Sequence, residues 1–224
     1  MLRSIILKGV RFLGYDLIKQ RDPIIDSDEQ FIRIYHQCKP YTMTSKERMY
    51  ALYKAVQYVN QAGIPGDLVE CGVWKGGSAM LMAMMSDRNI YLYDTFEGMT
   101  EPGEHDYSIA GKDGVAQGMS MASLESVKAN LQSTNVIFVK GKVEDTIPGT
   151  MPGQIALLRL DTDWYESTKH ELIHLYPLLA PGGVIIIDDY GHYAGAKKAV
   201  DEYFADKPIL LNRIDYTGRI GQKM

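Results

Sequence analysis

Two short apolar runs in the second half of the chain each end in a pair of carboxylates. The first run is followed by Asp161 and Asp163, and the second by Asp188 and Asp189. Apolar runs of this length, bounded by glycine and proline, are typical of buried strands in a parallel sheet. If the two strands are neighbours, four carboxylates meet at the ligand-binding edge of the sheet. Their mutual repulsion would then call for a bound cation or for shared protons.

Three more acids lie at the ends of three successive predicted strands: Glu70, Asp94 and Glu144. Glu70 precedes a turn that opens a helix and that contains Gly72, Gly76, Gly77 and Ser78. Glycines at such a turn let the backbone bend sharply and approach a ligand closely. The spacing is neither Gly-x-Gly-x-x-Gly nor that of a phosphate-binding P-loop. The turn therefore suits a cationic small molecule, with Asp94 placed for ribose hydroxyls and Glu144 for an adenine amino group.

These side chains need a scaffold in which short strands alternate with helices. The predicted strands cover residues 67–72, 89–94, 136–139, 155–160 and 184–187, and the predicted helices 78–85, 123–131, 166–179 and 194–204. This alternation favours an α/β fold with a doubly wound, mostly parallel sheet. Residues 208–215 and 219–222 predict a C-terminal antiparallel hairpin.

The chain before residue 63 has a helical pattern, with a capping box at residues 44–47 that predicts a helix start. We therefore expect an N-terminal helical extension over 1–62, serving oligomerisation or substrate cover, and a catalytic domain over 63–224. An apolar stripe over residues 2–13 is expected to pack on the same domain or on a sister subunit, with loose contact at a membrane surface as the alternative. We also expect a homo-oligomer. Residues 97–118 have no periodicity and predict either a lid or a disordered loop.

The amino-acid composition is that of an ordinary globular protein: 46% of the 224 residues are apolar and 23% are charged. A formal net charge of −4 gives no support for nucleic acid as a partner. Cys38 and Cys71 are too few for a disulfide framework, so we expect buried thiols and a cytoplasmic location. Since no apolar run is long enough to span a bilayer, we expect no stable membrane insertion, and a signal peptide is not expected either.

Four segments together resemble the macrocin O-methyltransferase family. They are Val69-Glu70-Cys71-Gly72-Val73 with Gly76-Gly77-Ser78, Tyr93-Asp94-Thr95-Phe96-Glu97-Gly98-Met99, Asp161-Thr162-Asp163-Trp164-Tyr165-Glu166-Ser167-Thr168, and Asp188-Asp189-Tyr190-Gly191. The resemblance runs in matching order from about residue 42 to the C-terminus. It implies a Rossmann-like class I methyltransferase fold and an enzyme that uses S-adenosylmethionine and Mg²⁺ to methylate a sugar hydroxyl of a glycosylated natural product, a glycan or a nucleotide-linked sugar.

The resemblance also implies roles for individual residues. Asp161, Asp188 and Asp189 match the family's metal ligands, and Asp163 matches its general base. The cofactor-binding positions are Glu70, Gly72, Gly76, Gly77, Ser78, Asp94, Thr95 and Glu144. For Asp188 or Asp189 the alternative is a helix cap. His192 and Tyr193 either contact the acceptor or belong to an exposed loop.

Three alternative functions stay open on the sequence. The same chemistry would serve a catechol or another aromatic diol, since it needs the same metal and acids. A nicotinamide-dependent oxidoreductase has an overlapping fold, although the chain lacks Gly-x-Gly-x-x-Gly and a Tyr-x-x-x-Lys pair. A non-catalytic binding module would leave the retained set of Asp residues unexplained.

Overall fold

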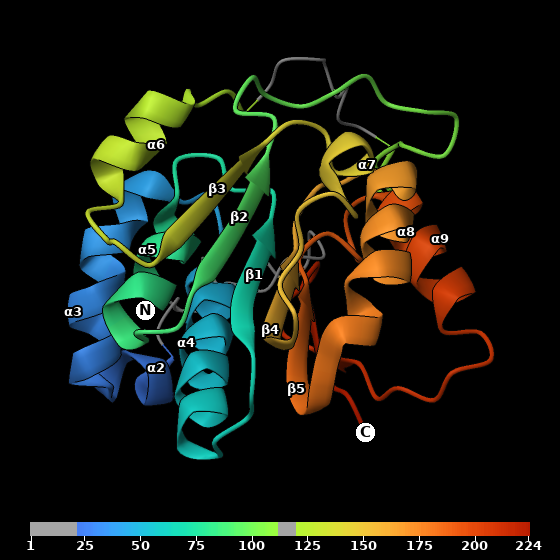
Figure 1. The fold of residues 1–224 in the computed structure, drawn as a ribbon. Helices are drawn as coiled ribbons and strands as arrows, with labels where there is room; N and C mark the ends of the chain where they lie inside the picture. The colour runs from blue at the N-terminus through green and yellow to red at the C-terminus, as the bar shows by residue number, and fades with distance from the viewer. Residues whose placement is uncertain (1–21, 112–119) are drawn as a thin grey trace, which may run out of the picture.

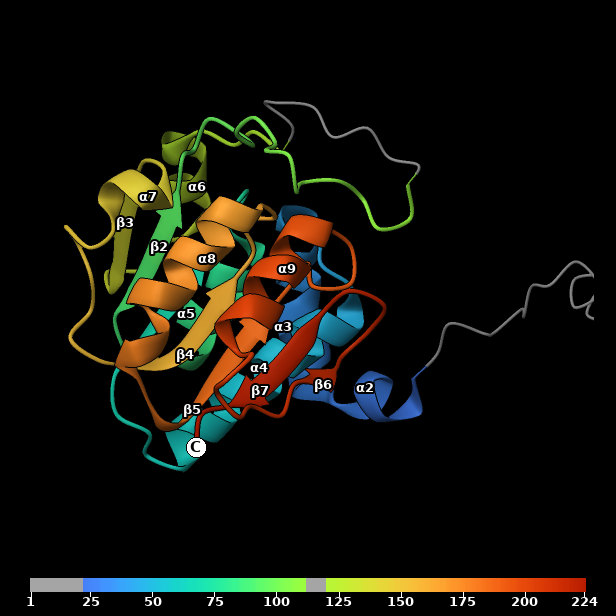
Figure 2. The same ribbon diagram turned by 90° about the vertical axis from the view of Figure 1, so that its right-hand side faces the viewer.

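The computed structural model of the chain describes residues 22–111 and 120–224. Seven strands form one sheet in the order β3-β2-β1-β4-β5-β7-β6. They are β1 (Asp67–Cys71), β2 (Ile90–Asp94), β3 (Val136–Lys140), β4 (Ile155–Leu160), β5 (Leu179–Ile187), β6 (Asn212–Arg213) and β7 (Arg219–Gln222). The first five are parallel, and β7 pairs antiparallel with both β5 and β6. The predicted doubly wound sheet and its C-terminal hairpin are confirmed (Figures 1 and 2).

Helices cover both faces of this sheet (Figure 1). On one side lie α2 (Pro23–Ser27), α3 (Glu29–Cys38), η1 (Lys39–Tyr41), α4 (Lys46–Gln61), α5 (Gly77–Met85) and α6 (Leu124–Asn130). On the other lie α7 (Val143–Thr146), α8 (Tyr165–His174), η2 (Tyr176–Leu178) and α9 (Ala194–Tyr203). Each face of the sheet is buried in its own hydrophobic cluster, as a parallel sheet requires.

The strand register sets where the acids lie. Leu160, the last residue of β4, pairs with Cys71 of β1 on one side and with Ile187 of β5 on the other. Asp161 and Asp188 therefore leave the sheet from adjacent positions. The direction of the strand order reverses between β1 and β4, which is where open α/β sheets bind their ligands.

Several predicted element boundaries are wrong. The helix predicted at 166–179 ends at His174 and gives way to a 3-10 turn that contains Pro177, because proline cannot continue the hydrogen-bond ladder of a helix. Strand β5 begins at Leu179, well before the predicted residue 184, and its pairing with β4 is irregular in the stretch that contains Pro181. The N-cap of α4 is Ser45, one residue after the Thr44 expected from the capping box, and Ser45 accepts from the Arg48 amide.

The helical segment before residue 63 shares a core with the rest of the chain. Phe31, Met49 and Val56 are fully buried in the same cluster as Leu68 of β1 and Leu81 of α5. The boundary at residue 62 thus stays a prediction, and the apolar stripe over 2–13 lies outside the described residues. Among the described residues, no helix combines the length and the apolar character needed to cross a bilayer.

Candidate active site

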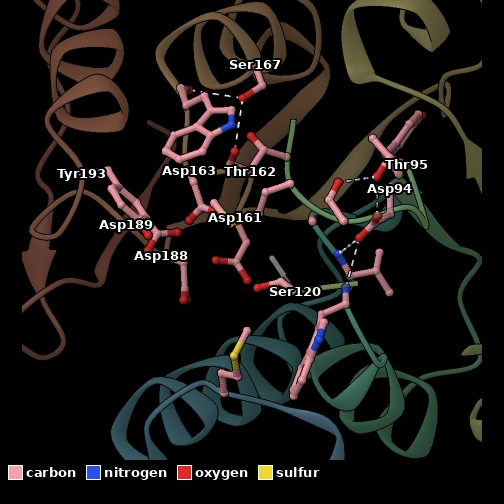
Figure 3. Close-up of a pocket in the computed structure, with 18 of the residues that line it drawn as sticks. Asp94, Thr95, Ser120, Asp161, Thr162, Asp163, Ser167, Asp188, Asp189 and Tyr193 are labelled. Atoms are coloured by element: carbon pink, nitrogen blue, oxygen red, sulfur yellow. Dashed lines mark hydrogen bonds between the residues drawn. The ribbon is translucent and has the colours of Figure 1, made fainter. Parts of the chain in front are cut away.

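A cavity of about 410 Å³ opens at the carboxyl ends of the parallel strands. Asp94, the last residue of β2, and Thr95 line one side, while Asp161, Asp163 and Asp189 line the other (Figure 3). The predicted positions Gly72, Ser78, Glu144 and Asp188 also lie on its wall. The structure therefore brings most of the predicted site residues into one cavity, as their common edge of the sheet requires.

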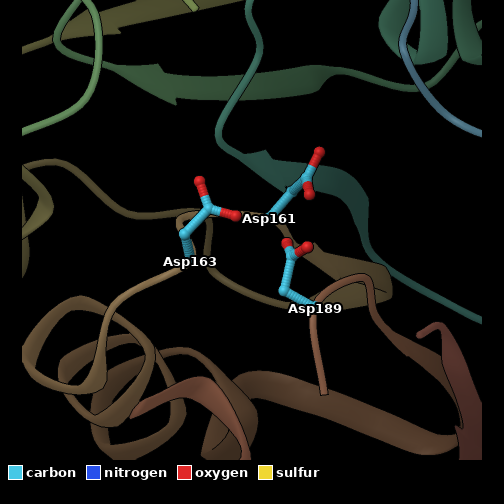
Figure 4. Close-up of side chains that lie close together, drawn as sticks. All are labelled: Asp161, Asp163 and Asp189. Atoms are coloured by element: carbon cyan, nitrogen blue, oxygen red, sulfur yellow. The ribbon is translucent and has the colours of Figure 1, made fainter. Parts of the chain in front are cut away.

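Three carboxylates converge tightly in this cavity. Asp161, Asp163 and Asp189 each offer an oxygen within 4.8 Å of the others (Figure 4). Exclusion from water and the neighbouring charge of Asp161 raise the pKa of Asp163 to about 7. Burial also raises the pKa of Asp161 and of Asp189 well above the usual range. In the absence of a cation, the raised pKa values favour the protonated form of these groups, and the buried Asp189 Oδ2 has no hydrogen-bond partner among the described residues.

The backbone that presents Asp163 is unusual. Its φ of +69° lies in the left-handed region, which a residue with a Cβ adopts at an energetic cost. Such conformations persist where the surroundings fix them, and they cluster at functional sites. The turn from Asp161 to Trp164 is therefore held in place by its neighbours.

Asp188 has a different environment from the other three. Its carboxylate forms one ion pair with Arg48 and a second with Arg159, whose Nη2 lies 2.9 Å from Asp188 Oδ1. The expected meeting of four carboxylates is thus only partly correct, because Asp188 is neutralised by two guanidinium groups. Its side chain is only 3% exposed.

Arg159 is the buried counter-charge of the site. It is the next-to-last residue of β4 and its side chain is 2% exposed, with Nη1 2.5 Å from Glu70 Oε1 and Nη2 2.8 Å from Asp161 Oδ2. Glu70 is fully buried and also accepts from the Ser78 hydroxyl. Burial raises the pKa of Glu70, and Arg159 and Ser78 oppose that rise. Glu70 consequently lies beneath the cavity wall rather than on it.

The glycine turn after β1 packs closely against the backbone at the end of β4. A Cβ on Gly72 would come within 2.0 Å of the Asp161 carbonyl oxygen, so only glycine lets the turn reach β4 there. Gly76 has a φ of +88° and is the N-cap of α5. Asp94 holds the turn against β2 by accepting from the Val73 and Trp74 amides at 2.6 and 3.1 Å. Gly76 and Gly77 shape this turn without lining the cavity.

The described part of the segment predicted as a lid or disordered loop, residues 97–111, folds against α8 and α9. The Trp164 indole donates to the Thr100 carbonyl at 3.2 Å, and Ser108 forms a β-bridge with Tyr193. The remainder of that prediction, 112–118, lies outside the described residues. His192 and Tyr193 line the cavity, whereas His105 packs edge-on against Tyr165.

Sequence reasoning missed the two arginines. Arg159 interrupts an otherwise apolar strand, and a charged residue at a buried position signals a buried partner. Arg48 lies in an ordinary amphipathic helix, so no local pattern marks it; Nε of Arg48 is 3.0 Å from Asp215 Oδ2, in the loop between β6 and β7. Trp74 and Ser120, which also line the cavity, were missed as well.

The strand order, the antiparallel β7 and an acidic cavity at the point where the order reverses define a class I methyltransferase. The solved structure of the O-methyltransferase NovP is similar, with a TM-score of 0.73 and 34% identity, and the match covers 82% of each chain. Residues 22–223 match the macrocin O-methyltransferase (TylF) family. The chain belongs to this family and is an O-methyltransferase.

Two relatives are named as O-methyltransferases, and the name of the first includes a rhamnosyl group. The 8-demethyl-8-(2,3-dimethoxy-α-L-rhamnosyl)-tetracenomycin-C 4′-O-methyltransferase of Streptomyces olivaceus is 37% identical over 80% of this chain and 74% of its own. The demethyldecarbamoylnovobiocin O-methyltransferase of Streptomyces niveus is 34% identical over 77% of this chain and 73% of its own. These matches favour a transferase over a nicotinamide-dependent oxidoreductase or a non-catalytic module.

Proposed function

We propose that the protein transfers a methyl group from S-adenosylmethionine to a sugar hydroxyl of a glycosylated natural product, with Mg²⁺ in the acidic cluster. The observation that carries this proposal is the convergence of Asp161, Asp163 and Asp189 in the same cavity as Asp94. One half of the cavity then binds the methyl donor, and we call this half the donor seat. The other half binds the metal and the acceptor.

S-adenosylmethionine, when bound, supplies a methyl group on a positively charged sulfur. We assign Asp94 and Thr95 to its ribose and Glu144, exposed in the first turn of α7, to its adenine. Each Asp94 oxygen already accepts from backbone amides, but a carboxylate oxygen has a further lone pair for a hydroxyl donor. Gly72 and Ser78 border the remaining part of the donor seat, with Glu70, Gly76 and Gly77 holding its shape from beneath.

The acidic cluster fits a hard divalent cation, since its donors are carboxylate oxygens and Asp189 Oδ2 is buried without a partner. We assign Asp161, Asp188 and Asp189 as ligands. Bound Mg²⁺ would lower the pKa of a chelated sugar hydroxyl. Because Arg48 and Arg159 already neutralise Asp188, they limit the charge repulsion among the ligands.

Asp163 is the proposed general base. Its carboxylate adjoins those of Asp161 and Asp189, so it can accept a proton from a hydroxyl held beside them. In the metal-free protein its pKa is raised to about 7, so its carboxylate is more basic there than that of an ordinary Asp. The left-handed backbone at Asp163 fixes the direction from which it approaches the acceptor.

Aromatic side chains border the acceptor half of the cavity. Trp164, Tyr193 and Tyr216 line it, and the Trp164 and Tyr193 rings meet edge-on with centroids 5.2 Å apart. Such rings provide apolar faces against which a sugar can pack. Together with the rhamnosyl group in the name of the first relative, this favours a sugar acceptor over a catechol.

The experiment is methyl transfer from radiolabelled S-adenosylmethionine to demethyldecarbamoylnovobiocin, to the rhamnosyl-tetracenomycin named above, and to catechol. We expect a labelled glycoside and no labelled catechol. Labelling of catechol alone would reject the sugar acceptor. Activity that is lost in EDTA and recovered with Mg²⁺ supports the metal, and unchanged activity in EDTA would reject it.

Three further expectations stay predictions: a helical extension over 1–62, a homo-oligomeric state and a cytoplasmic location. Light scattering coupled to size-exclusion chromatography measures the oligomeric state directly. Fractionation of the producing cells tests the location.

A further inference from the structure

Asp106 contacts the turn that carries Asp163, although it lies in a different segment of the chain. Its Oδ1 accepts from the Tyr165 amide at 2.8 Å, two residues after Asp163. Tyr165 is the first residue of α8, and the N-cap residue Trp164 makes no side-chain capping bond. The first turn of α8 is thus capped by a carboxylate from the 97–111 loop, where the helix dipole favours negative charge.

The loop presents this carboxylate in a fixed orientation. Asp106 Oδ2 accepts from the Gly103 amide at 2.8 Å, and the Asp106 amide donates to the Gly103 carbonyl at 3.1 Å. Both carboxylate oxygens are therefore occupied, one by the loop itself and one by α8. Removing the carboxylate would disconnect the two segments.

The first turn of α9 leaves room for this contact. A Cβ on Gly195 would lie 1.9 Å from Asp106 Oδ1 and 2.8 Å from the Tyr165 nitrogen. Any other residue at position 195 would collide with the carboxylate and the backbone it holds. The two helices that flank the acceptor side of the cavity thus meet at Asp106.

One side-chain and two backbone hydrogen bonds also hold the loop on both sides of Asp106. The Trp164 indole donates to the Thr100 carbonyl, the Ile109 amide donates to the His192 carbonyl, and the Ala194 amide donates to the Tyr107 carbonyl. The loop therefore bridges the turn after β4 and the segment after β5, and each of these carries acids of the cluster.

From this geometry we propose that Asp106 is a positioning residue for the reaction. It fixes the strained turn at Asp163 through the Tyr165 amide, so that the Asp163 carboxylate faces the acceptor hydroxyl. This inference rests on the proposed function, in which Asp163 is the general base. Asp106 does not line the cavity and makes no contact with the reacting groups.

The test compares Asp106→Ala and Asp106→Asn with the matched control Glu101→Ala, which removes an exposed carboxylate from the same loop. The assay is methyl transfer to the two glycosides named above. We expect Asp106→Ala to lower kcat by about tenfold to hundredfold, the scale of a small misplacement of a reacting group. The KM for S-adenosylmethionine should change less than about twofold, because the donor seat lies at β1 to β3. Asn retains one oxygen that can accept from Tyr165 but loses the acceptor for the Gly103 amide, so Asp106→Asn should restore part of the kcat.

Gly195→Ala provides a second route to the same defect without altering Asp106 and should lower kcat similarly. A melting temperature near that of the parent shows that each variant is folded. Unchanged kcat in Asp106→Ala, or an equal loss in Glu101→Ala, would overturn the proposal. So would a loss in Asp106→Ala that Asp106→Asn does not relieve.

The failure of the proposed function is distinguishable from this outcome. If Asp163→Asn retains full activity, Asp163 is not the base, whatever Asp106 does. If neither glycoside is methylated, hydrogen exchange of the peptide spanning 161–168 decides whether the contact exists. Faster exchange in Asp106→Ala than in Glu101→Ala supports the positioning contact, and equal exchange rejects it.

Discussion

Arg159 and Asp161 lie two residues apart on the chain and form an ion pair, with 2.8 Å between Nη2 and Oδ2. Residues at this spacing on a strand point to the same side of the sheet. Strand β4 therefore supplies both an acid of the cluster and the positive charge that balances it. Because the same guanidinium contacts Glu70 and Asp188, one buried arginine joins the floor of the donor seat to the acidic cluster.

Replacing this arginine should destabilise the fold. Arg159→Met leaves Glu70 and Asp161 without their counter-charge and Asp188 with Arg48 alone, so we expect the free energy of unfolding to fall by about 3–5 kcal/mol. Urea denaturation monitored by tryptophan fluorescence measures the change. The matched control is Arg33→Met, whose exposed guanidinium lies 4.0 Å from Glu29 and should contribute little. Similar losses in the two variants would contradict the role of Arg159.

The stability of the metal-free enzyme should depend on the protonation of Asp163. Its pKa is about 7 in the folded state against an ordinary value of 3.8, so the folded state binds more protons than the unfolded state between these values. Its protonation therefore favours folding at low pH, and that contribution disappears as the pH rises through 7. In EDTA, the melting temperature of Asp163→Asn should fall less steeply between pH 4 and pH 7 than that of the parent. Parallel curves would show that Asp163 titrates normally.

Substitutions at Asp161 and Asp163 should affect metal binding and proton abstraction separately. Asp163→Asn should lower kcat by about 10²–10⁴, the usual contribution of a general base, with nearly unchanged affinity for Mn²⁺ as a probe. Asp161→Asn should weaken Mn²⁺ binding by more than about tenfold, since even groups that only orient a ligand contribute that much. Calorimetric titration of each variant with Mn²⁺ measures the affinity. The opposite pattern would make Asp163 a ligand and Asp161 dispensable for binding.

Close packing at Gly77 should make it sensitive to a single methyl group. A Cβ there would lie 2.7 Å from the Tyr41 carbonyl oxygen and from Thr42 Cβ, so Gly77→Ala forces α5 away from the segment before α4. We expect a loss of about 1–3 kcal/mol in unfolding free energy, typical of overpacking, and weaker binding of S-adenosylmethionine. Gly153→Ala is the control, because a Cβ at Gly153 has no neighbour within 4 Å. Chemical denaturation and calorimetry with the cofactor give both quantities.

The sequence predicts the parts of this structure that depend on local pattern. The carboxylates at the ends of β4 and β5 were located because an Asp pair after an apolar run marks where a strand leaves the sheet. The partners of these acids were not predicted. Arg48 reaches Asp188 across 140 residues and Asp106 reaches Tyr165 across 59, and no short-range periodicity encodes such contacts. The ion pairs of Asp188 with Arg48 and Arg159 depend on such contacts between separate segments.

The ion pair between Arg48 and Asp215 has a consequence for synthesis on the ribosome. All the acids of the cluster lie before residue 190, but Asp215 and strand β7 come after it. Before β7 pairs with β5 and Asp215 forms its ion pair with Arg48, Asp188 is the remaining carboxylate among the described residues that pairs with this guanidinium. The chain up to residue 190 therefore carries every acid of the cluster but lacks Asp215, one of the two carboxylates that pair with Arg48.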